Sequence, residues 1–351
     1  MIKLNELLEN AVKNEASDIF IISGSPIKEK TDGHIHQLND EKLFPDDTKS
    51  LISEIYASAN RSMDKFIQTG DDDFSFSVPS LARFRVNTYK QRNSMAAVIR
   101  IVSFDIPDYK ELGIPDEVMN IADTTGGMIL FTGTAGSGKS TTQACIIDRI
   151  NKTRDCHIVT LEDPIEYLHR HQKSIVSQRE ISIDTQDYLS ALRACLRQSP
   201  DVILLGEMRD AQTIQTALTA AETGHAIIAT LHTKGAVHAI DRIIDAFPSV
   251  QQPQIRTQLS LVLKTVISQQ LIPDTKGELI PAYGIMHVNN AIRNLIRDNK
   301  NHQIENSILS SSGEGMITMD QYLLKLYKKG QITKDVLLQY SDNSEQIKRN
   351  I

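Results

Sequence analysis

Apolar and polar residues alternate with two different periods in the first hundred residues. The segments DDDFSFSV (71–78) and ARFRVNTYKQRNSMAAVIRIV (82–102) alternate with a period of two, as strands of a half-buried sheet do. Other stretches predict a helix over 4–14, a strand over 18–22, a turn over 23–26, a charged hairpin over 28–38, and a helix over roughly 45–68. This part of the chain therefore predicts a mixed α/β domain.

The next stretch, SFDIPDYKELGIP (103–115), holds two prolines and little periodicity. Such a composition predicts a linker. A length of 351 residues suits two domains. We therefore expect an N-terminal domain over 1–102, the linker over 103–115 and a second domain over 116–351.

Short apolar runs in the second part predict buried strands, with helical stretches between several of them. These runs are 127–131, 157–161, 202–205 and 226–231. Their alternation with helices predicts an α/β fold built on a largely parallel sheet. From about residue 248 the chain is expected to be rich in helices, over 255–271, 291–298 and 318–340.

Composition narrows the class of protein. The formal net charge is −6, Trp is absent and aromatic residues make up 5%, which argues against a nucleic-acid-binding surface. Cys145, Cys156 and Cys195 are scattered and form no C-x-x-C, so neither a zinc site nor a disulfide framework is expected. The N-terminus lacks the features of a signal peptide, and no apolar run approaches the ~20 residues of a membrane span. We expect a cytoplasmic protein that meets the membrane only through partners.

The stretch FTGTAGSGKSTT (131–142) has the form G-x-x-x-x-G-K-S and follows a predicted buried strand. Its glycines allow a tight turn that presents backbone N–H groups to phosphate oxygens, and the following helix points its N-terminus at the same phosphates. Lys139 is expected to reach the β- and γ-phosphates of ATP, and the Ser140 hydroxyl to bind Mg²⁺. The predicted nucleotide-binding residues are Gly133, Thr134, Ala135, Gly136, Ser137, Gly138, Lys139, Ser140 and Thr141.

Carboxylates follow two other predicted strands. In TLEDPIEYLH (160–169), Glu162, Asp163 and Glu166 suit the orientation of water beside a metal-bound nucleotide. The same residues also suit a solvated helix start in which Asp163 is the cap. In PDVILLGEMRD (200–210), Glu207 stands at the carboxyl end of a strand, where α/β sheets place ligands. That position predicts a Walker B carboxylate near the metal.

Two histidines bracket a further apolar strand in AAETGHAIIATLHT (220–233). Lone histidines are more often structural than functional, and these are not spaced for a zinc protease. His232, however, stands at the carboxyl end of a strand in the sheet that carries the phosphate loop. At that position it would be able to sense the γ-phosphate. His225 is a second candidate for nucleotide contact.

In order, these four stretches resemble the Walker A, Asp box, Walker B and His box of the secretion and pilus motor ATPases. Within that family, the chain resembles the type IV pilus retraction ATPases. The resemblance extends to ASDIFIISGSP, RFRVNTYKQR, AIRNLIR and GMITMDQYL, and so covers nearly the whole chain. It implies an N-terminal PAS-like domain, a RecA-like ATPase domain with a helical C-terminal region, ATP bound between the two domains, and a homo-hexameric ring.

The resemblance also implies roles for individual residues. Glu166 would position the attacking water, and Glu207 would support Mg²⁺ and the γ-phosphate, with the division of these two roles left open. Arg85 and Arg100 match N-terminal-domain arginines that serve as fingers in related motors. Arg83 shares a strand face with Arg85 and is a competing candidate. The alternative for these arginines is a salt bridge on a sheet face.

The implied function is retraction of the pilus. Nucleotide turnover would swing the two domains about the linker and drive a platform protein in the inner membrane, with a second retraction ATPase as a candidate partner. A pilus assembly or type II secretion ATPase is the nearest alternative, although such chains generally carry a longer N-terminal region and a four-cysteine zinc module. A RecA-like nucleic-acid translocase and a non-hydrolysing subunit of a mixed ring are more distant alternatives.

Overall fold

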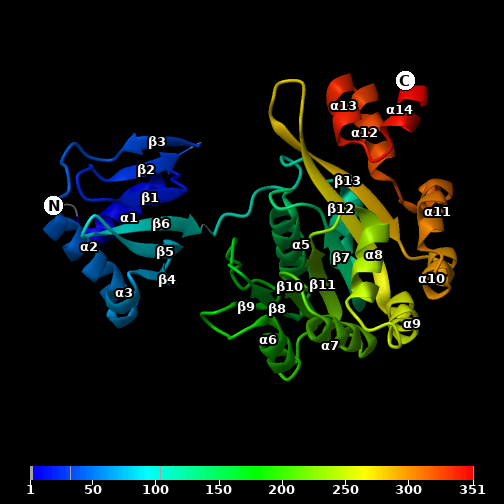
Figure 1. The fold of residues 1–351 in the computed structure, drawn as a ribbon, viewed down its shortest axis with the longest axis horizontal. Coiled ribbons are helices and arrows are strands. Elements are labelled where there is room, and N and C mark those ends of the chain that lie inside the picture. Colours follow the sequence, from blue (N-terminus) through cyan, green and yellow to red (C-terminus); the bar gives the residue numbers. More distant parts are fainter. Residues whose placement is uncertain (1–2, 32, 103, 351) are drawn as a thin grey trace. The chain divides into compact units, whose positions relative to one another are not determined.

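The computed structural model describes residues 3–31, 33–102 and 104–350. Contacts between Cα atoms divide the chain into two compact units, one of residues 1–105 with 166–168 and one of residues 106–165 with 169–351. Each unit has its own sheet (Figure 1). Each also has its own buried apolar core. Among the described residues, none of the helices is both long enough and apolar enough to cross a bilayer.

The first unit is an antiparallel sheet of six strands with three helices. The strands lie in the order β3-β2-β1-β6-β5-β4. Its elements are α1 (Leu4–Lys13), β1 (Asp18–Ile21), β2 (Lys28–Thr31), β3 (His34–Gln37), α2 (Pro45–Ser58), α3 (Asp64–Thr69), β4 (Asp71–Val78), β5 (Ala82–Gln91) and β6 (Ser94–Val102). The period-two segments are therefore strands, as predicted.

Alternation along β4 and β5 explains how this sheet buries one face. Phe74, Phe76 and Phe84 are buried and pack in one cluster with apolar residues of α1 and α2. A two-residue turn at Arg92–Asn93, with φ values of 46° and 61°, joins β5 to β6. Positive φ at both central residues is typical of the type I′ hairpin, whose twist matches that of the strands it connects.

The helix predicted over roughly 45–68 is in fact two helices, α2 and α3. The break follows Ser58, and Asn60 adopts a left-handed φ of 49°. A left-handed residue ends an α-helix, and asparagine tolerates that conformation better than most side chains do. The apolar spacing on the two sides of the break suggested one continuous helix.

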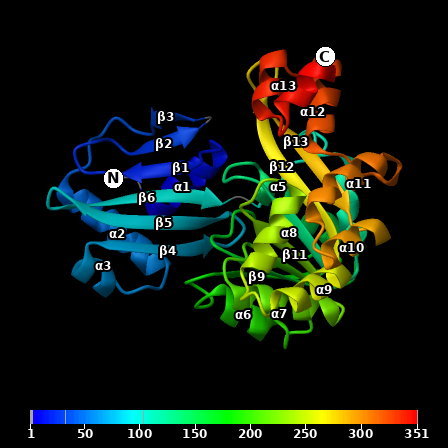
Figure 2. The same cartoon turned by 45° about the vertical axis from the view of Figure 1, so that its right-hand side comes forward.

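The second unit is built on a sheet of seven strands in the order β13-β12-β7-β11-β10-β8-β9. All neighbours are parallel except β12 and β13, which form a long antiparallel hairpin (Figure 2). The strands are β7 (Gly127–Thr132), β8 (His157–Glu162), β9 (Ile175–Glu180), β10 (Val202–Leu205), β11 (Ala226–Leu231), β12 (Leu263–Pro273) and β13 (Leu279–His287). The predicted parallel sheet is confirmed.

Helices cover both faces of this sheet and continue beyond it. They are α4 (Asp116–Met119), α5 (Lys139–Thr153), α6 (Tyr188–Cys195), α7 (Ala211–Glu222), α8 (Gly235–Asp245), α9 (Gln252–Val262), α10 (Asn290–Arg297), α11 (Ile304–Ser310), α12 (Met319–Lys328), α13 (Lys334–Tyr340) and α14 (Ser344–Asn350), with short 3₁₀ turns at Asn120–Asp123, Asn301–Gln303 and Ser312–Glu314. The last three helices pack together on Ile272 and Ala282 of the β12–β13 hairpin.

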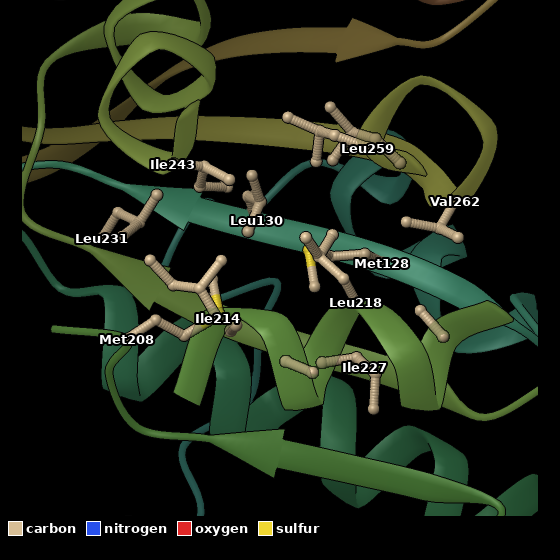
Figure 3. Close-up of a cluster of buried hydrophobic side chains, with 14 of the residues drawn as sticks. Met128, Leu130, Met208, Ile214, Leu218, Ile227, Leu231, Ile243, Leu259 and Val262 are labelled. Atoms are coloured by element: carbon tan, nitrogen blue, oxygen red, sulfur yellow. The ribbon is translucent and has the colours of Figure 1, made fainter. Parts of the chain in front are cut away.

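Strand β7 lies at the centre of the unit and is buried along its whole length. Met128 and Leu130 face one cluster with Ile214 and Leu218 of α7 (Figure 3). The alternate residues of β7 face a second cluster that includes apolar residues of α5. Burial on both faces explains why β7 reads as a continuous apolar run.

Three strands of the second unit were not predicted: β9, β12 and β13. The segment 255–271 was expected to be a helix, but it is α9 followed by most of β12. Its second half contains the β-branched residues Thr265, Val266 and Ile267, which favour a strand, but Lys264, Ser268, Gln269 and Gln270 interrupt the apolar pattern. Strand β9 is polar in sequence and lies at the sheet edge, so it lacks a clear apolar pattern.

Most of the predicted linker belongs to the second unit. It begins at Ser103, which lies outside the described residues, and the division between the units falls after Asp105. Ile106, Leu112 and Ile114 pack in the cluster that contains α5. These apolar side chains give residues 106–115 a fixed place despite the absence of helix or strand there.

Candidate functional site

The glycine-rich loop joins the carboxyl end of β7 to the start of α5. Gly133 has a φ of 146°, and a Cβ atom there would lie 2.3 Å from the carbonyl oxygen of Gln269 on β12. Gly138 is in the left-handed region, with a φ of 83°, directly before the first residue of α5. Only glycine fits both conformations without strain. The loop therefore passes close to β12 and aims the N-terminus of α5 into the space in front of it.

Lys139 is the first residue of α5 and is 6% exposed. Its Nζ donates hydrogen bonds to the carbonyl oxygens of Gly133 (2.9 Å) and Thr134 (2.7 Å), and lies 3.3 Å from Oγ of Ser137. These contacts hold the ammonium group against the loop. The position is the one from which a Walker A lysine meets phosphate oxygens.

A cavity of about 750 Å³ opens beside this loop within the second unit. Its walls include residues 132–137 of the loop, residues 234–238 at the start of α8 and residues 268–271 of β12. Such a volume is in the range of ligand-binding cavities in proteins. Ser140, one residue after Lys139, is exposed.

Glu207 follows β10 and is 7% exposed. Its Oε1 lies 2.6 Å from Nε of Arg209, and its Oε2 lies 3.5 Å from Nε2 of His232. The parallel register brings the carboxyl ends of β7, β8, β10 and β11 to one edge of the sheet. The phosphate loop, Glu207 and His232 therefore gather at that edge, as expected from their places in the sequence.

The carboxylates of the predicted Asp box have different surroundings. Glu162 accepts hydrogen bonds from Thr160 and Gln178. Asp163 lines a second cavity, of about 300 Å³, together with Glu207. Glu166, three residues after Asp163, is exposed. Asp163 is thus the member of the predicted cluster that the structure brings to Glu207.

Tyr188 at the start of α6 also lines the 300 Å³ cavity. A Cβ atom added to Gly206 would lie 2.8 Å from its hydroxyl oxygen, so the phenol lies over the residue that precedes Glu207. Burial, and then the negative charges of Glu207, Asp163 and Glu162, raise the pKa of Tyr188 well above its ordinary value. The phenol therefore stays protonated beside the carboxylates.

His225 does not join the site, and its prediction as a nucleotide contact is corrected. It precedes β11, whose first residue pairs with Gly127 at the amino end of β7. That edge lies about 20 Å from the phosphate loop, at ~3.3 Å per residue of strand. The imidazole Nδ1 lies 2.9 Å from the carbonyl oxygen of Ala220 and 3.2 Å from Oγ1 of Thr223, which indicates a cap on the end of α7.

The three candidate arginines lie in the first unit. Arg85 on β5 is directly opposite Arg100 on β6, and Arg83 occupies the same face of β5. Nε of Arg85 lies 3.6 Å from Asp73, and Nε of Arg100 lies 3.0 Å from Asp18. Arg85 and Arg100 thus form one cationic pair flanked by carboxylates.

The donor set fits Mg²⁺ that arrives with a nucleotide. No cluster of three or more His, Cys, Asp or Glu side chains within the described part of the chain is placed to hold a metal ion alone. Mg²⁺ usually keeps several waters and takes one or two protein oxygens together with substrate phosphates. The Ser140 hydroxyl and the Glu207 carboxylate are suitable protein donors.

Two neighbours of Glu207 were not predicted from the sequence. Arg209 stands two residues after Glu207 in GEMRD, so the sequence placed opposite charges close together. The structure shows that the two side chains form an ion pair. Tyr188 is distant from Glu207 in sequence and offered no such signal. Only the packing of α6 against the sheet brings its phenol to Gly206.

A glycine-rich loop between a parallel strand and a helix, with a buried lysine and a neighbouring strand-end carboxylate, defines a P-loop nucleoside-triphosphate-binding protein. The family model described as "Type II/IV secretion system protein" matches residues 1–319. The chain belongs to this family.

Individual relatives show which members of the family this chain resembles. The chain is 42% identical to "Type IV pilus retractation ATPase PilT" of Pseudomonas aeruginosa over 333 residues, which cover 95% of this chain and 96% of that protein. It is 41% identical to "Twitching motility protein" of Neisseria gonorrhoeae, covering 89% of this chain and 83% of that protein. The structure "Crystal Structure of the Pilus Retraction Motor PilT and Bound ADP" matches with a TM-score of 0.89 and 45% identity, covering 99% of this chain and 100% of that one.

Proposed function

We propose that this chain hydrolyses ATP and uses the energy to power retraction of type IV pili, as one subunit of a homo-hexameric ring. The observation that carries the proposal is the meeting of the phosphate loop, Glu207 and His232 at one edge of the parallel sheet. Similarity to a pilus retraction ATPase over 95% of the chain supports the biological role.

Each residue at the sheet edge has a part in the proposed chemistry. Lys139 leaves the loop carbonyls to contact the β- and γ-phosphates, while loop N–H groups surround the phosphate oxygens. Ser140 and Glu207 hold Mg²⁺, which when bound neutralises charge on the phosphates. His232 contacts the γ-phosphate, and its position beside Glu207 allows both to respond to the same group.

Further roles are proposed for Glu166 and for arginines of the first unit. Glu166 is proposed to position the attacking water, and its exposure leaves the carboxylate accessible. Arg85 is the proposed finger, with Arg100 and Arg83 as the neighbouring candidates. Phosphoryl transfer depends chiefly on positioning and charge stabilisation, so a site without such a cation would be slow.

The larger assembly is also part of the proposal. The first unit acts as the PAS-like domain and the second as the RecA-like ATPase domain, in a cytoplasmic ring at the inner membrane. The ring acts on a platform protein of that membrane, with a second retraction ATPase as a candidate partner, and without direct contact to nucleic acid.

Purified protein provides the test of the enzymatic part. We expect ATP turnover that depends on Mg²⁺ and that double-stranded or single-stranded DNA does not stimulate. Stimulation by DNA would favour a nucleic-acid translocase. ATP binding without turnover would favour the non-hydrolysing ring subunit.

A further inference from the structure

The ion pair between Arg209 and Glu207 occupies the carboxylate that the proposed metal site needs. Nε of Arg209 lies 2.6 Å from Oε1 of Glu207, while His232 lies nearest to the other oxygen, Oε2. One oxygen of Glu207 therefore makes an ion pair with Arg209, and the other faces His232. A magnesium ion or its bound water would have to share or replace one of these contacts.

The two partners of this ion pair differ greatly in their exposure to solvent. The side chain of Arg209 is 77% exposed, whereas that of Glu207 is 9% exposed. An exposed guanidinium is held to a carboxylate by only a small free energy, so the arginine rather than the glutamate is the member that can leave. Glu207 would keep its place at the end of β10 throughout.

An alternative partner for Arg209 lies in the same cavity. The 300 Å³ cavity is lined by Arg209, Glu207 and also by Asp163, which the structure leaves exposed. Asp163 follows β8 and Glu207 follows β10, so the arginine stands where two strand-end carboxylates are accessible. An exposed arginine that lines one cavity with two strand-end carboxylates has a second candidate partner in Asp163.

We propose that Arg209 is a positioning residue that gates the metal site: it pairs with Glu207 until Mg²⁺ and nucleotide bind, and it then moves toward Asp163. The gate keeps the Glu207 carboxylate neutralised and oriented until the metal replaces the guanidinium. This inference rests on the proposed function, because it assigns a role to Arg209 in loading that same nucleotide site.

The test measures metal binding rather than turnover. A fluorescent ADP analogue is titrated onto the full chain at a series of Mg²⁺ concentrations, and the Mg²⁺ midpoint of binding is recorded. Arg209→Gln should lower this midpoint about two- to fivefold, the size expected from one exposed ion pair, because Mg²⁺ no longer competes with a guanidinium. Arg209→Lys keeps the charge and should restore a midpoint near that of the wild type.

A matched control distinguishes a specific role of Arg209 from a general effect of removing one positive charge. Arg242→Gln removes an arginine from α8, away from the 300 Å³ cavity, and should leave the midpoint unchanged. An unchanged or raised midpoint in Arg209→Gln, with normal binding by the wild type, would overturn the gate. Failure of the wild type to bind the ADP analogue at any Mg²⁺ concentration would instead overturn the proposed function.

Discussion

Arg85 and Arg100 stand directly opposite each other on β5 and β6 of the antiparallel sheet. Two like charges in such a cross-strand pair destabilise a sheet unless other groups offset them. Asp73 and Asp18 supply that compensation, but unequally, because the Asp73 side chain is 53% exposed and that of Asp18 only 10%. The two arginines are therefore expected to contribute unequally to the stability of the folded first unit.

Arg85→Ala should slow ATP turnover with little loss of stability. Its ion pair with Asp73 is exposed and contributes at most about 1 kcal/mol to folding, whereas an arginine finger is worth ~10³ or more in rate. Steady-state ATPase assays and thermal melts measure the two effects. Arg100→Ala is the comparison, and it should lower the melting temperature more, because it leaves the buried Asp18 carboxylate without its partner. A lower melting temperature with an unchanged rate in Arg85→Ala would make Arg85 a structural residue instead.

Lys139→Ala should abolish nucleotide binding. The substitution removes the ammonium group that the loop carbonyls hold at the start of α5. Calorimetric titration with ADP and Mg²⁺ checks this directly. Lys152→Ala removes a lysine from the same helix, where it pairs with Asp148, and should bind like the wild type. Equal binding by the two variants would exclude the phosphate loop as the nucleotide site.

Glu207→Gln should bind nucleotide but lose turnover, by about 10²–10³-fold as for other single electrostatic groups in active sites. The amide keeps the shape of the side chain but loses the charge that faces His232 and the metal position. Binding titrations and turnover assays on one preparation distinguish the two properties. Undiminished turnover would indicate that Glu207 is not the essential carboxylate and would favour Glu166. Glu166→Gln is therefore assayed alongside.

The acid stability of the first unit should depend on Asp72. This carboxylate is 2% exposed. Burial by itself would raise its pKa, but hydrogen bonds and charges from Arg61 and Lys65 outweigh that effect and lower the pKa to about 2. Because the folded-state pKa lies below the ordinary value near 4, the ionised carboxylate stabilises the fold above pH ~4, and this contribution is lost as pH falls toward 2.

Asp72→Asn should therefore lower the free energy of unfolding at pH 7 by about 1–3 kcal/mol and flatten its dependence on pH between ~4 and 2. Urea unfolding followed by circular dichroism at several pH values measures both effects. Asp71→Asn, on the neighbouring exposed position of β4, is the control and should behave like the wild type. Parallel pH profiles for wild type and Asp72→Asn would rule out Asp72 as the titrating group.

Local signals account for the parts of the fold that were predicted correctly. The glycine positions, Lys139 and the apolar run of β7 are adjacent in sequence, so the loop and its strand were predictable together. The order of parallel strands then placed Glu207 and His232 at the same edge, since both end strands of one sheet. His225, at the start of the same strand, was a wrong prediction because it lies at the opposite edge.

The features that were missed depend on packing between distant segments. The strand β12 mixes apolar and polar residues with no clear period of two, and its pairing with β7 and β13 identifies it as a strand. The approach of Tyr188 to Gly206 depends on how α6 packs, which no short sequence pattern encodes. The pairing of Arg209 with Glu207 is a local feature instead, set by the turn after β10, and its signal in GEMRD was overlooked.

The central claim is that the energy of ATP drives retraction, and surface pili in the host organism test it most directly. The gene is deleted, and the strain is complemented with the wild-type chain or with Glu207→Gln. Pili are then counted and twitching is scored. We predict that the deletion and the Glu207→Gln strain keep normal or excess pili and lose twitching, and that the wild-type chain restores movement. Loss of pili in the deletion strain would contradict the account and would assign this motor to pilus assembly.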